Sequence, residues 1–349
     1  GCHINLLSTR ALNKSEQLKL VQLMAPLNAI FGAGGLSWDG GLDFCDDPRA
    51  FRVKRITADR AHGRVPKPMI MLRDEPFADR PYFRLQVTGF ASPRSPIGSW
   101  LQIDLASLCL RAVLADARPR WLPQDPLQAI RARPHMPISV CRGKRGWARS
   151  LTKYELAMNT LVWLLDFAEQ QVSAESKPQI DWLRATSVAA LETNAQPELS
   201  PPVLLATDIA IKRVLFDRIA RLHQFENFSA LARASRATSP GTEVRDAIDA
   251  LVVADVLFCA SQDSTYEAAH SAGLFVRPAF AEPVRTDRLP EGVCIRDRAR
   301  AELIAAGKIS FCNWDHYVTR EGKAWCVQNP WSHRPTAAPH VDVDLDFPF

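Results

Sequence analysis

The sequence contains no two cysteines in the Cys-x-x-Cys spacing, although it has eight cysteines among its 349 residues. This absence argues against a zinc ribbon or a dithiol redox site. Cys109 and Cys259 lie in apolar runs, where a free cysteine behaves as a small hydrophobic residue. The sequence also shows no signal peptide. These features are typical of a protein from a reducing compartment, and we expect a cytoplasmic location.

Two further absences concern the surroundings of the protein. The sequence has no apolar run of roughly eighteen residues, which argues against a transmembrane helix. It has no dense block of Lys and Arg either, and a formal net charge of +5 spread over the chain is a weak argument for nucleic acid. We therefore expect neither a membrane nor a nucleic-acid partner, whereas an acidic protein partner is compatible with the charge.

What the sequence does contain is a globular composition and a definite order of elements. Hydrophobic residues make up 47% and charged residues 23%, and the length suits about two or three domains. Strand patterns lie mainly in the first third, at 1–9, 51–56 and 83–90, and helical patterns follow without strand–helix–strand alternation. This order predicts an α+β fold. The expected helices span about 14–30, 100–115, 125–133, 152–171, 178–193, 207–223 and 242–257, with a last helix ending near Ala306 and capped by Gly307.

The segment from Arg73 to Asp79 is the most informative one for chemistry. It places one arginine and three carboxylates in seven residues, between an apolar run at 69–72 and the strand pattern at 83–90. That density at the ends of two strands is unusual for a simple loop. Elsewhere, a glycine turn at 32–35 could cradle a phosphate. It lacks the lysine of a P-loop, so a plain turn explains it equally well.

Several short segments, in their order and spacing, resemble the Pup ligases and depupylases. Together they extend from the first residues to about residue 300. They are Gly1-Cys-His-Ile-Asn5, Phe31-Gly-Ala-Gly34, Arg73-Asp-Glu-Pro-x-Ala-Asp79, Tyr82-Phe-Arg-Leu85, Asp125-Pro-Leu-Gln-Ala-Ile130, Asp208-Ile-Ala-Ile-Lys-Arg-Val-Leu-Phe216 and Ala260-Ser-Gln-Asp-Ser264.

The resemblance implies a glutamine-synthetase-like fold, in which a curved, mostly antiparallel sheet is backed by helices and a small C-terminal domain follows. The expected organisation is a catalytic-core portion over residues 1–235, the small domain over 236–308 and an aromatic, proline-rich extension over 309–349. We expect this extension to pack as an arm on the core, or else to present its tryptophans to a partner.

The resemblance further implies an ATP- and Mg²⁺-dependent enzyme. Members of the family form or hydrolyse an isopeptide bond between a ubiquitin-like, Pup-like protein modifier and lysines of target proteins. In the forming direction, the γ-phosphate of ATP passes to the C-terminal glutamate of the modifier, and a lysine attacks the acyl phosphate. The segment 260–264 and the run from Pro278 to Pro283 lean towards the deconjugating branch.

Individual residues receive expected roles from the same resemblance. Arg73 and Arg84 are the expected clamps for phosphate or a substrate carboxylate, because the planar guanidinium fork suits both groups. His3 and Glu75 are the expected metal-contacting residues. Each has a purely structural alternative, since His3 fits an ordinary strand histidine and the arginines fit ion pairs with loop carboxylates.

A second group of residues has weaker expected roles. Lys212 and Arg213 are further candidates for binding phosphate or carboxylate, although a solvated helix face is the ordinary role of such residues. Asn5 and Asp74 are expected to support the site, and Asp74 either holds metal or water or only braces the loop. Gln86 stands where the family has a histidine, and its neutral amide is a poorer ligand for magnesium.

The family also carries two magnesium-binding glutamates and a catalytic aspartate before the segment that corresponds to residues 1–5. We therefore expect no catalytic residue in this chain. An N-terminal fragment or a second polypeptide is expected to complete the sheet and the site, which the intact mass of the native complex would test.

Two other functions stay open at this point. A catalytically inactive homologue that binds a modifier or partner protein is one of them, supported by Gln86 and by the altered run 88–93, which lacks the acid and the amide of the family. The other is a small-molecule carboxylate–amine ligase on the same fold. Binding of ATP separates the first of these from the enzymes, and incubation with modifier proteins separates the second from the isopeptide enzymes.

Overall fold

The computed structural model describes eleven stretches of the chain, and its contacts divide the chain into two compact units. Unit 1 comprises Gly1–Leu6, Leu12–Leu72 and Gln86–Ala281, and unit 2 comprises Leu7–Ala11, Arg73–Leu85 and Glu282–Phe349. The described residues are 4–38, 41–58, 67–71, 83–142, 147–196, 198–260, 263–277, 309–312, 316–320, 324–326 and 336–337.

A four-stranded sheet contains the strands that the sequence predicts in the first third of the chain. Its order is β1-β6-β5-β4, formed by β1 (Ile4–Ser8), β6 (Phe83–Val87), β5 (Lys67–Met71) and β4 (Val53–Ala58). The pair β5–β6 is antiparallel, whereas β4–β5 is parallel. The pairs β2–β3, β7–β8, β8–β9, β10–β11, β11–β12 and β12–β13 are also antiparallel, so a mostly antiparallel arrangement is confirmed.

Buried and exposed residues alternate in β1, whereas β6 buries consecutive residues at its end. In β1, Ile4 and Leu6 are buried and Asn5 is exposed. Gln86 in β6 and Thr88 directly after it are polar residues, yet both are buried. The physical reason is that each polar group has a partner in the protein, which offsets the cost of removing it from water. Thr88 Oγ1, for example, donates to the Pro68 carbonyl at 2.7 Å.

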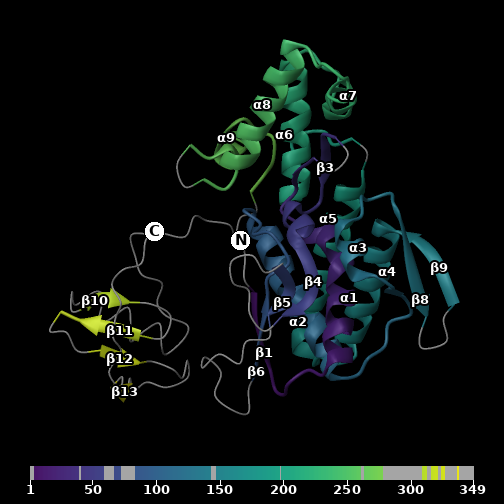
Figure 1. Cartoon of the computed structure of the whole chain (residues 1–349). Helices are drawn as coiled ribbons and strands as arrows, with labels where there is room; N and C mark the ends of the chain where they lie inside the picture. Colours follow the sequence, from purple (N-terminus) through teal and green to yellow (C-terminus); the bar gives the residue numbers. More distant parts are fainter. Residues whose placement is uncertain are drawn as a thin grey trace. The chain divides into compact units, whose positions relative to one another are not determined.

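Helix α1 (Lys14–Phe31) is the central helix of unit 1. It begins at a capping box between Asn13 and Glu16, and nearly all of its second half is buried. It contacts α2, α3, α4 and α5 as well as β4 and β5. Figure 1 shows α1 running among these helices behind the strands, so helices back the sheet as expected.

Helix α2 (Pro96–Leu114) is apolar nearly all round, because it is enclosed in the protein. In the described part of the chain it is the one helix long and apolar enough to cross a membrane by length and composition, and most of it is buried. It packs against α1 and α4, and Leu101 and Leu105 are fully buried. A helix enclosed in this way has the character of a core helix.

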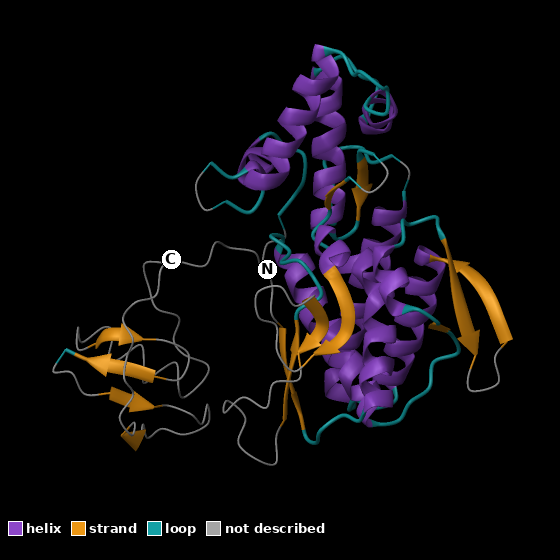
Figure 2. Cartoon of the chain, viewed as in Figure 1, coloured by secondary structure: helices purple, strands orange, loops and turns teal. Residues whose placement is uncertain are grey.

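A hairpin between α3 (Pro126–Arg131) and α4 (Lys153–Glu169) was not predicted. Its strands β8 (Pro137–Arg142) and β9 (Trp147–Thr152) pair antiparallel, and β7 (Leu122–Pro123) adds a short third strand. Figure 2 shows the two long strands at the edge of the helices. The predicted helix over 152–171 is confirmed as α4 and begins at a capping box, in which Thr152 Oγ1 accepts from the Glu155 amide and the Glu155 carboxylate accepts from the Thr152 amide.

The later helices build a second hydrophobic core cluster within unit 1. Buried residues of α6 (Asp208–Leu222) and α8 (Thr242–Leu257) contribute most of its helical part, together with α7 (Phe228–Ala234), α9 (Thr265–Ser271) and residues near β2 (Gly35–Ser37) and β3 (Asp43–Cys45). The predicted α6 and α8 are confirmed, as is α5 (Lys177–Ala195), whereas α7 and α9 were not predicted. Two short 3-10 helices, Pro48–Arg52 and Ala174–Ser176, complete the described part of the unit.

The described part of unit 2 includes an antiparallel meander. It runs in the order β10 (Ile309–Cys312), β11 (His316–Thr319), β12 (Ala324–Cys326) and β13 (Thr336–Ala337). The tail therefore contains strands, where only an arm was expected. The helix predicted to end near Ala306 lies outside the described residues, and the domain boundaries at 235 and 308 stay predictions.

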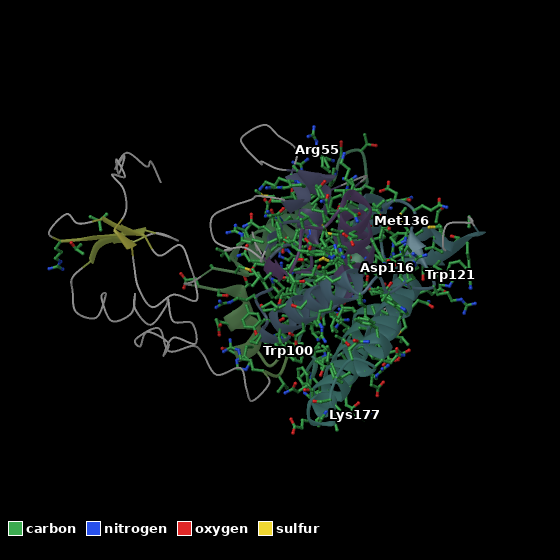
Figure 3. The ribbon with its side chains drawn as sticks, turned by 90° about the horizontal axis from the view of Figure 1, so that it is seen from below. Arg55, Trp100, Asp116, Trp121, Met136 and Lys177 are labelled. Carbon is green, nitrogen blue, oxygen red and sulfur yellow. The ribbon has the colours of Figure 1, made fainter. Side chains whose placement is uncertain are left out.

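The surface of unit 1 carries many charged side chains. Figure 3 shows the exposed Arg55 of β4 and the exposed Lys177 of α5 at opposite ends of this unit. Lys177 pairs with Glu169 at 2.8 Å across the α4–α5 turn, and both side chains remain largely in water. Pairs of this kind contribute little to stability, so the fold depends on its buried contacts.

Candidate functional site

Four of the nine predicted site residues fall outside the described residues. His3, Arg73, Asp74 and Glu75 all lie there, so their roles stay predictions. Arg84 is described and lies in β6. The remaining predicted residues belong to unit 1.

Asn5 and Gln86 are brought together by the neighbouring strands β1 and β6. The Gln86 Nε2 atom donates to Asn5 Oδ1 at 3.5 Å, a long hydrogen bond, and Gln86 is 9% exposed. Register places Gln86 opposite Met71 of β5. The side-chain amide of Gln86, which replaces the histidine of the family, is thus hydrogen-bonded to the side-chain amide of Asn5 in the same sheet.

These two amides do not amount to a metal site. Within the described residues, no group of three or more His, Cys, Asp and Glu side chains is placed to hold a metal ion. Magnesium requires several oxygen ligands in near-octahedral geometry, and carboxylates usually supply the protein's share. The described part of the chain therefore does not by itself fit an Mg²⁺ site.

The glycine turn after α1 is held from inside the protein by Lys212. The Lys212 Nζ atom donates to the Gly34 carbonyl at 3.1 Å and pairs with Asp255 at 2.7 Å. The other oxygen of Asp255 accepts from the Leu36 amide at 3.2 Å. Lys212 is 5% exposed, so it does not lie on a solvated helix face, and its amine is engaged by protein groups.

Within this turn, Gly32 is required by close packing and Gly34 by its backbone conformation. A Cβ atom on Gly32 would lie 2.1 Å from the Asp46 carbonyl oxygen and 2.6 Å from that of Asn28. Gly34 has a φ of 56°, in the left-handed region that favours glycine. The turn is therefore built by packing against the segment after β3, and its carbonyl is used by Lys212.

Replacing Gly32 with alanine is expected to lower the free energy of unfolding by about 2–3 kcal/mol, because backbone must move to admit the methyl group. Denaturant unfolding measures this loss. Gly241→Ala is the control, since no atom lies within 4 Å of the added Cβ. It is expected to cost less than about 1 kcal/mol, the usual range for such a change at an N-cap. Equal losses in the two variants would contradict this account of the turn.

Arg213 faces a different region from Lys212, although the two are adjacent in the sequence. Its Nη1 atom donates to the Asn194 carbonyl at 2.7 Å, and Nη2 donates to the Gln196 carbonyl. These carbonyls lie at the C-terminal end of α5, where a cation also interacts favourably with the helix dipole. The structure thus assigns Arg213 a capping contact.

Asn194 lies in α5 and hydrogen-bonds to α1, to α4 and to the start of α6. Its Nδ2 atom donates to the carbonyls of Ala29 and Ile30 at 2.9 and 3.2 Å, in the last turn of α1. Its Oδ1 atom accepts from Thr207 Oγ1 at 2.8 Å, at the start of α6. Tyr154 of α4 also donates to its carbonyl at 2.7 Å. Sequence reasoning missed this residue, because an asparagine near a helix end carries no signal of a distant partner.

A cavity of about 650 Å³ opens beside these contacts, within unit 1. That volume is in the range of small-molecule sites. Its walls come from β3, the residues after α3, the start of α4, the end of α5, α6 and α7. The lining residues are Asp43, Phe44, Asp46, Arg133, Pro134, His135, Thr152, Tyr154, Asn194, Ala195, Gln196, Arg213, Phe216, Asp217, Phe228, Ser229, Ala232, Arg233 and Arg236.

Asp46, one of the lining residues, belongs to a fully buried ion pair. Lys153 Nζ and Asp46 Oδ2 are 2.8 Å apart, and each side chain is 1% exposed. Lys153 also donates to the carbonyls of Ile130 and Ala132, at the end of α3. Burial raises the pKa of Tyr154 and the Asp46 carboxylate raises it further, so Tyr154 is a neutral hydrogen-bond donor at physiological pH.

The residues that flank Asp46 are buried as well. Burial raises the pKa of the Cys45 thiol, and the Asp47 carboxylate adds to that shift. Cys45 is therefore a thiol rather than a reactive thiolate. Burial also raises the pKa of Asp47 to about 6. Its carboxylate accepts from the amides of Arg49 and Ala91, which fixes the chain after β3.

Comparison with known proteins agrees with this architecture. The family model described as Pup-ligase protein matches residues 1–233. Among solved structures, a complex between the prokaryotic ubiquitin-like protein Pup and its ligase PafA is 19% identical, with a TM-score of 0.67, and the match covers 99% of this chain and 67% of that chain. The Pup ligase PafA in complex with ADP is also 19% identical, with a TM-score of 0.65 and coverage of 96% and 71%. No curated protein sequence matched the chain.

These similarities extend over the strands and helices described above. The two PafA structures share the α+β architecture of the chain, which confirms the expected glutamine-synthetase-like fold. The family match covers the sheet, the central helices and α6, and it includes every residue that the sequence singled out for the site. Because this match spans more than half of the chain, the protein belongs to the Pup-ligase family.

Proposed function

We propose that this protein is an ATP-dependent enzyme that forms an isopeptide bond between a Pup-like modifier and a lysine of a target protein. The observation that carries the proposal is the family match over residues 1–233. Two further points support it. One structural neighbour is a ligase in complex with Pup, and the other is a ligase in complex with ADP.

The proposed reaction has two stages. The γ-phosphate of ATP is transferred to the C-terminal glutamate of the modifier, and the amine of a target lysine then displaces the phosphate to form the amide. Phosphoryl transfer depends on groups that orient oxygens and offset their charge. Arg73 and Arg84 are proposed for this task, because a guanidinium binds phosphate or carboxylate through two parallel hydrogen bonds.

The family implies Mg²⁺ as a second cofactor. Its expected contacts in this chain, His3 and Glu75, lie outside the described residues. We also propose a cytoplasmic location with target proteins as further partners. The four cysteines in the described part of the chain are all free, which suits a reducing compartment.

The direction of the reaction is proposed to be conjugation. The lean towards deconjugation rested on the segment 260–264 and on the run from Pro278 to Pro283. The run lies outside the described residues, and the described residues of the segment have structural roles. Ser264 is the N-cap residue of α9 and its Oγ donates to the Phe258 carbonyl at 3.0 Å. Asp263 has a φ of 51°, typical of a turn. The comparisons, in turn, name ligases.

A non-catalytic, modifier-binding homologue is the second candidate. The hydrogen bond between Gln86 and Asn5 favours it, because an amide engaged in this way replaces the metal-binding type of residue. ATP binding measured by calorimetry separates the two candidates, since the non-catalytic homologue is expected to bind modifier without nucleotide.

The test of the proposed function is a conjugation assay with ATP, a Pup-like modifier ending in glutamate and a lysine-containing protein. We expect a covalent conjugate by intact-mass spectrometry, and Arg84→Gln is expected to reduce its initial rate at least about tenfold, as loss of a charge-assisted hydrogen bond predicts. Arg245→Gln, on the exposed side of α8, is the control and is expected to leave the rate unchanged. ATP-dependent loss of preformed conjugate without its formation would reverse the proposed direction.

A further inference from the structure

The cavity beside Asn194 contains an unusual set of arginines. Four of its lining residues are Arg133, Arg213, Arg233 and Arg236. The elements that surround it, β3 and α4 to α7, can be followed in Figure 1. Arg84, one of the predicted nucleotide clamps, is not among the lining residues.

The carboxylates of the cavity wall are already engaged by protein groups. Asp43 pairs with Arg133 at 2.8 Å. Asp46 pairs with the buried Lys153. Asp217 accepts from the Phe228 amide at 2.8 Å, before the first turn of α7. The four arginines of the wall therefore outnumber its three carboxylates, and one of these carboxylates is already paired with Lys153.

Arg233 and Arg236 differ from Arg133 and Arg213, whose guanidinium groups bind protein groups. Both are exposed, and they lie three residues apart at the C-terminal end of α7. Within the residues that the structure describes, neither side chain makes a hydrogen bond or an ion pair. A Cβ atom on Gly41 would lie 3.3 Å from Arg236 Nε, so Arg236 extends across to the turn between β2 and β3.

This arrangement matches a particular kind of anion. Arg233 and Arg236 place two positive charges in the lining of one cavity, and a ligand group with about two negative charges can offset both of them. A phosphate monoester has this charge and presents three acceptor oxygens, which two guanidinium forks can share. A single carboxylate carries only one charge.

The rest of the cavity suits an organic group attached to the phosphate. Phe44, Phe216 and Phe228 contribute aromatic carbon to its wall, and Ala195 and Ala232 add aliphatic carbon. His135 and Ser229 add polar groups that can hydrogen-bond to a ligand. Ligand sites commonly combine an apolar lining with a few converging polar groups.

We propose that this cavity binds the phosphate monoester of a small organic molecule, with Arg233 and Arg236 holding the phosphate. The site goes beyond the proposed conjugation reaction, because it uses none of the residues assigned to that reaction. A bound ligand would join α7 to the β2–β3 turn and to the end of α5.

Calorimetry on the full chain, with phenyl phosphate, inorganic phosphate and succinate as probes, tests the proposal. Phenyl phosphate is expected to bind more tightly than inorganic phosphate, because its ring buries apolar surface, and more tightly than succinate, whose two charges are separate. Arg233→Gln and Arg236→Gln are each expected to weaken phenyl phosphate binding about tenfold, in line with one charge-assisted hydrogen bond.

The matched control is Arg218→Gln, which removes an equal charge from the exposed face of α6 outside the cavity. It is expected to leave the affinity for phenyl phosphate within about twofold. Three results would overturn the proposal: no binding of phenyl phosphate at millimolar concentration, equal binding of succinate, or an equal loss of affinity in Arg218→Gln and the two cavity variants. Unchanged unfolding midpoints would show that the variants are folded.

Discussion

Replacing Lys153 with methionine is expected to lower the free energy of unfolding by about 3–5 kcal/mol. The substitution keeps most of the side-chain volume but removes the amine that lies 2.8 Å from Asp46. An unpaired carboxylate then remains in a region that is closed to water. The carbonyls of Ile130 and Ala132 also lose their donor. Denaturant unfolding monitored by circular dichroism measures the loss.

Two further variants sharpen this experiment. Adding Asp46→Asn to Lys153→Met removes the unpaired charge, so the double variant is expected to be more stable than Lys153→Met alone. Lys177→Met removes the exposed partner of Glu169 and is expected to leave the unfolding midpoint unchanged. If Lys153→Met lowers the free energy of unfolding by less than about 1 kcal/mol, the ion pair between Lys153 and Asp46 does not stabilise the fold as expected.

Replacing Asn194 with alanine is expected to cost about 3–5 kcal/mol, because three buried polar groups lose a partner at once. The carbonyls of Ala29 and Ile30 lose the Nδ2 donor, and Thr207 Oγ1 loses its acceptor. Each unsatisfied buried group costs about 1–3 kcal/mol. The loss is measured from the denaturant midpoint and the slope of the unfolding transition.

Asn194→Asp isolates the amide donor. It keeps an acceptor for Thr207 but turns a negative charge towards two carbonyl oxygens, so we expect a loss at least as large as that of Asn194→Ala. The control is Asn159→Ala, which removes an exposed amide that donates to the Glu155 carbonyl within α4. It is expected to cost under about 0.5 kcal/mol. Similar losses at positions 159 and 194 would contradict the role given to Asn194.

Local signals predicted the long helices and failed for the short elements. Helix α4 begins at the capping box of Thr152 and Glu155, and α8 spans the predicted 242–257, because capping and apolar periodicity act within a few residues. The hairpin β8–β9 and the short helix α7 were missed. The packing of α7 against α6 and α8 involves other segments of the chain, which override local preference, whereas the hairpin was missed although its two strands are close in the sequence.

In the predicted site, too, the sequence indicated some of the contacts and missed others. Adjacent strands brought Asn5 and Gln86 together, as the strand assignment allowed. Lys212 and Arg213 were considered as a pair because they are neighbours in the sequence. They point to different surroundings in the fold, since successive helix positions are about 100° apart. One holds the glycine turn and the other caps α5.

The sequence by itself determined the family, the α+β class and the positions of the long helices. It could do so because motif order, periodicity and capping are all written along the chain. Only the tertiary structure decided which polar residues act as internal braces, as Lys153 and Asn194 do, and where arginines gather around a cavity. Burial and counter-charge are properties of contacts between distant segments, and no local pattern encodes them.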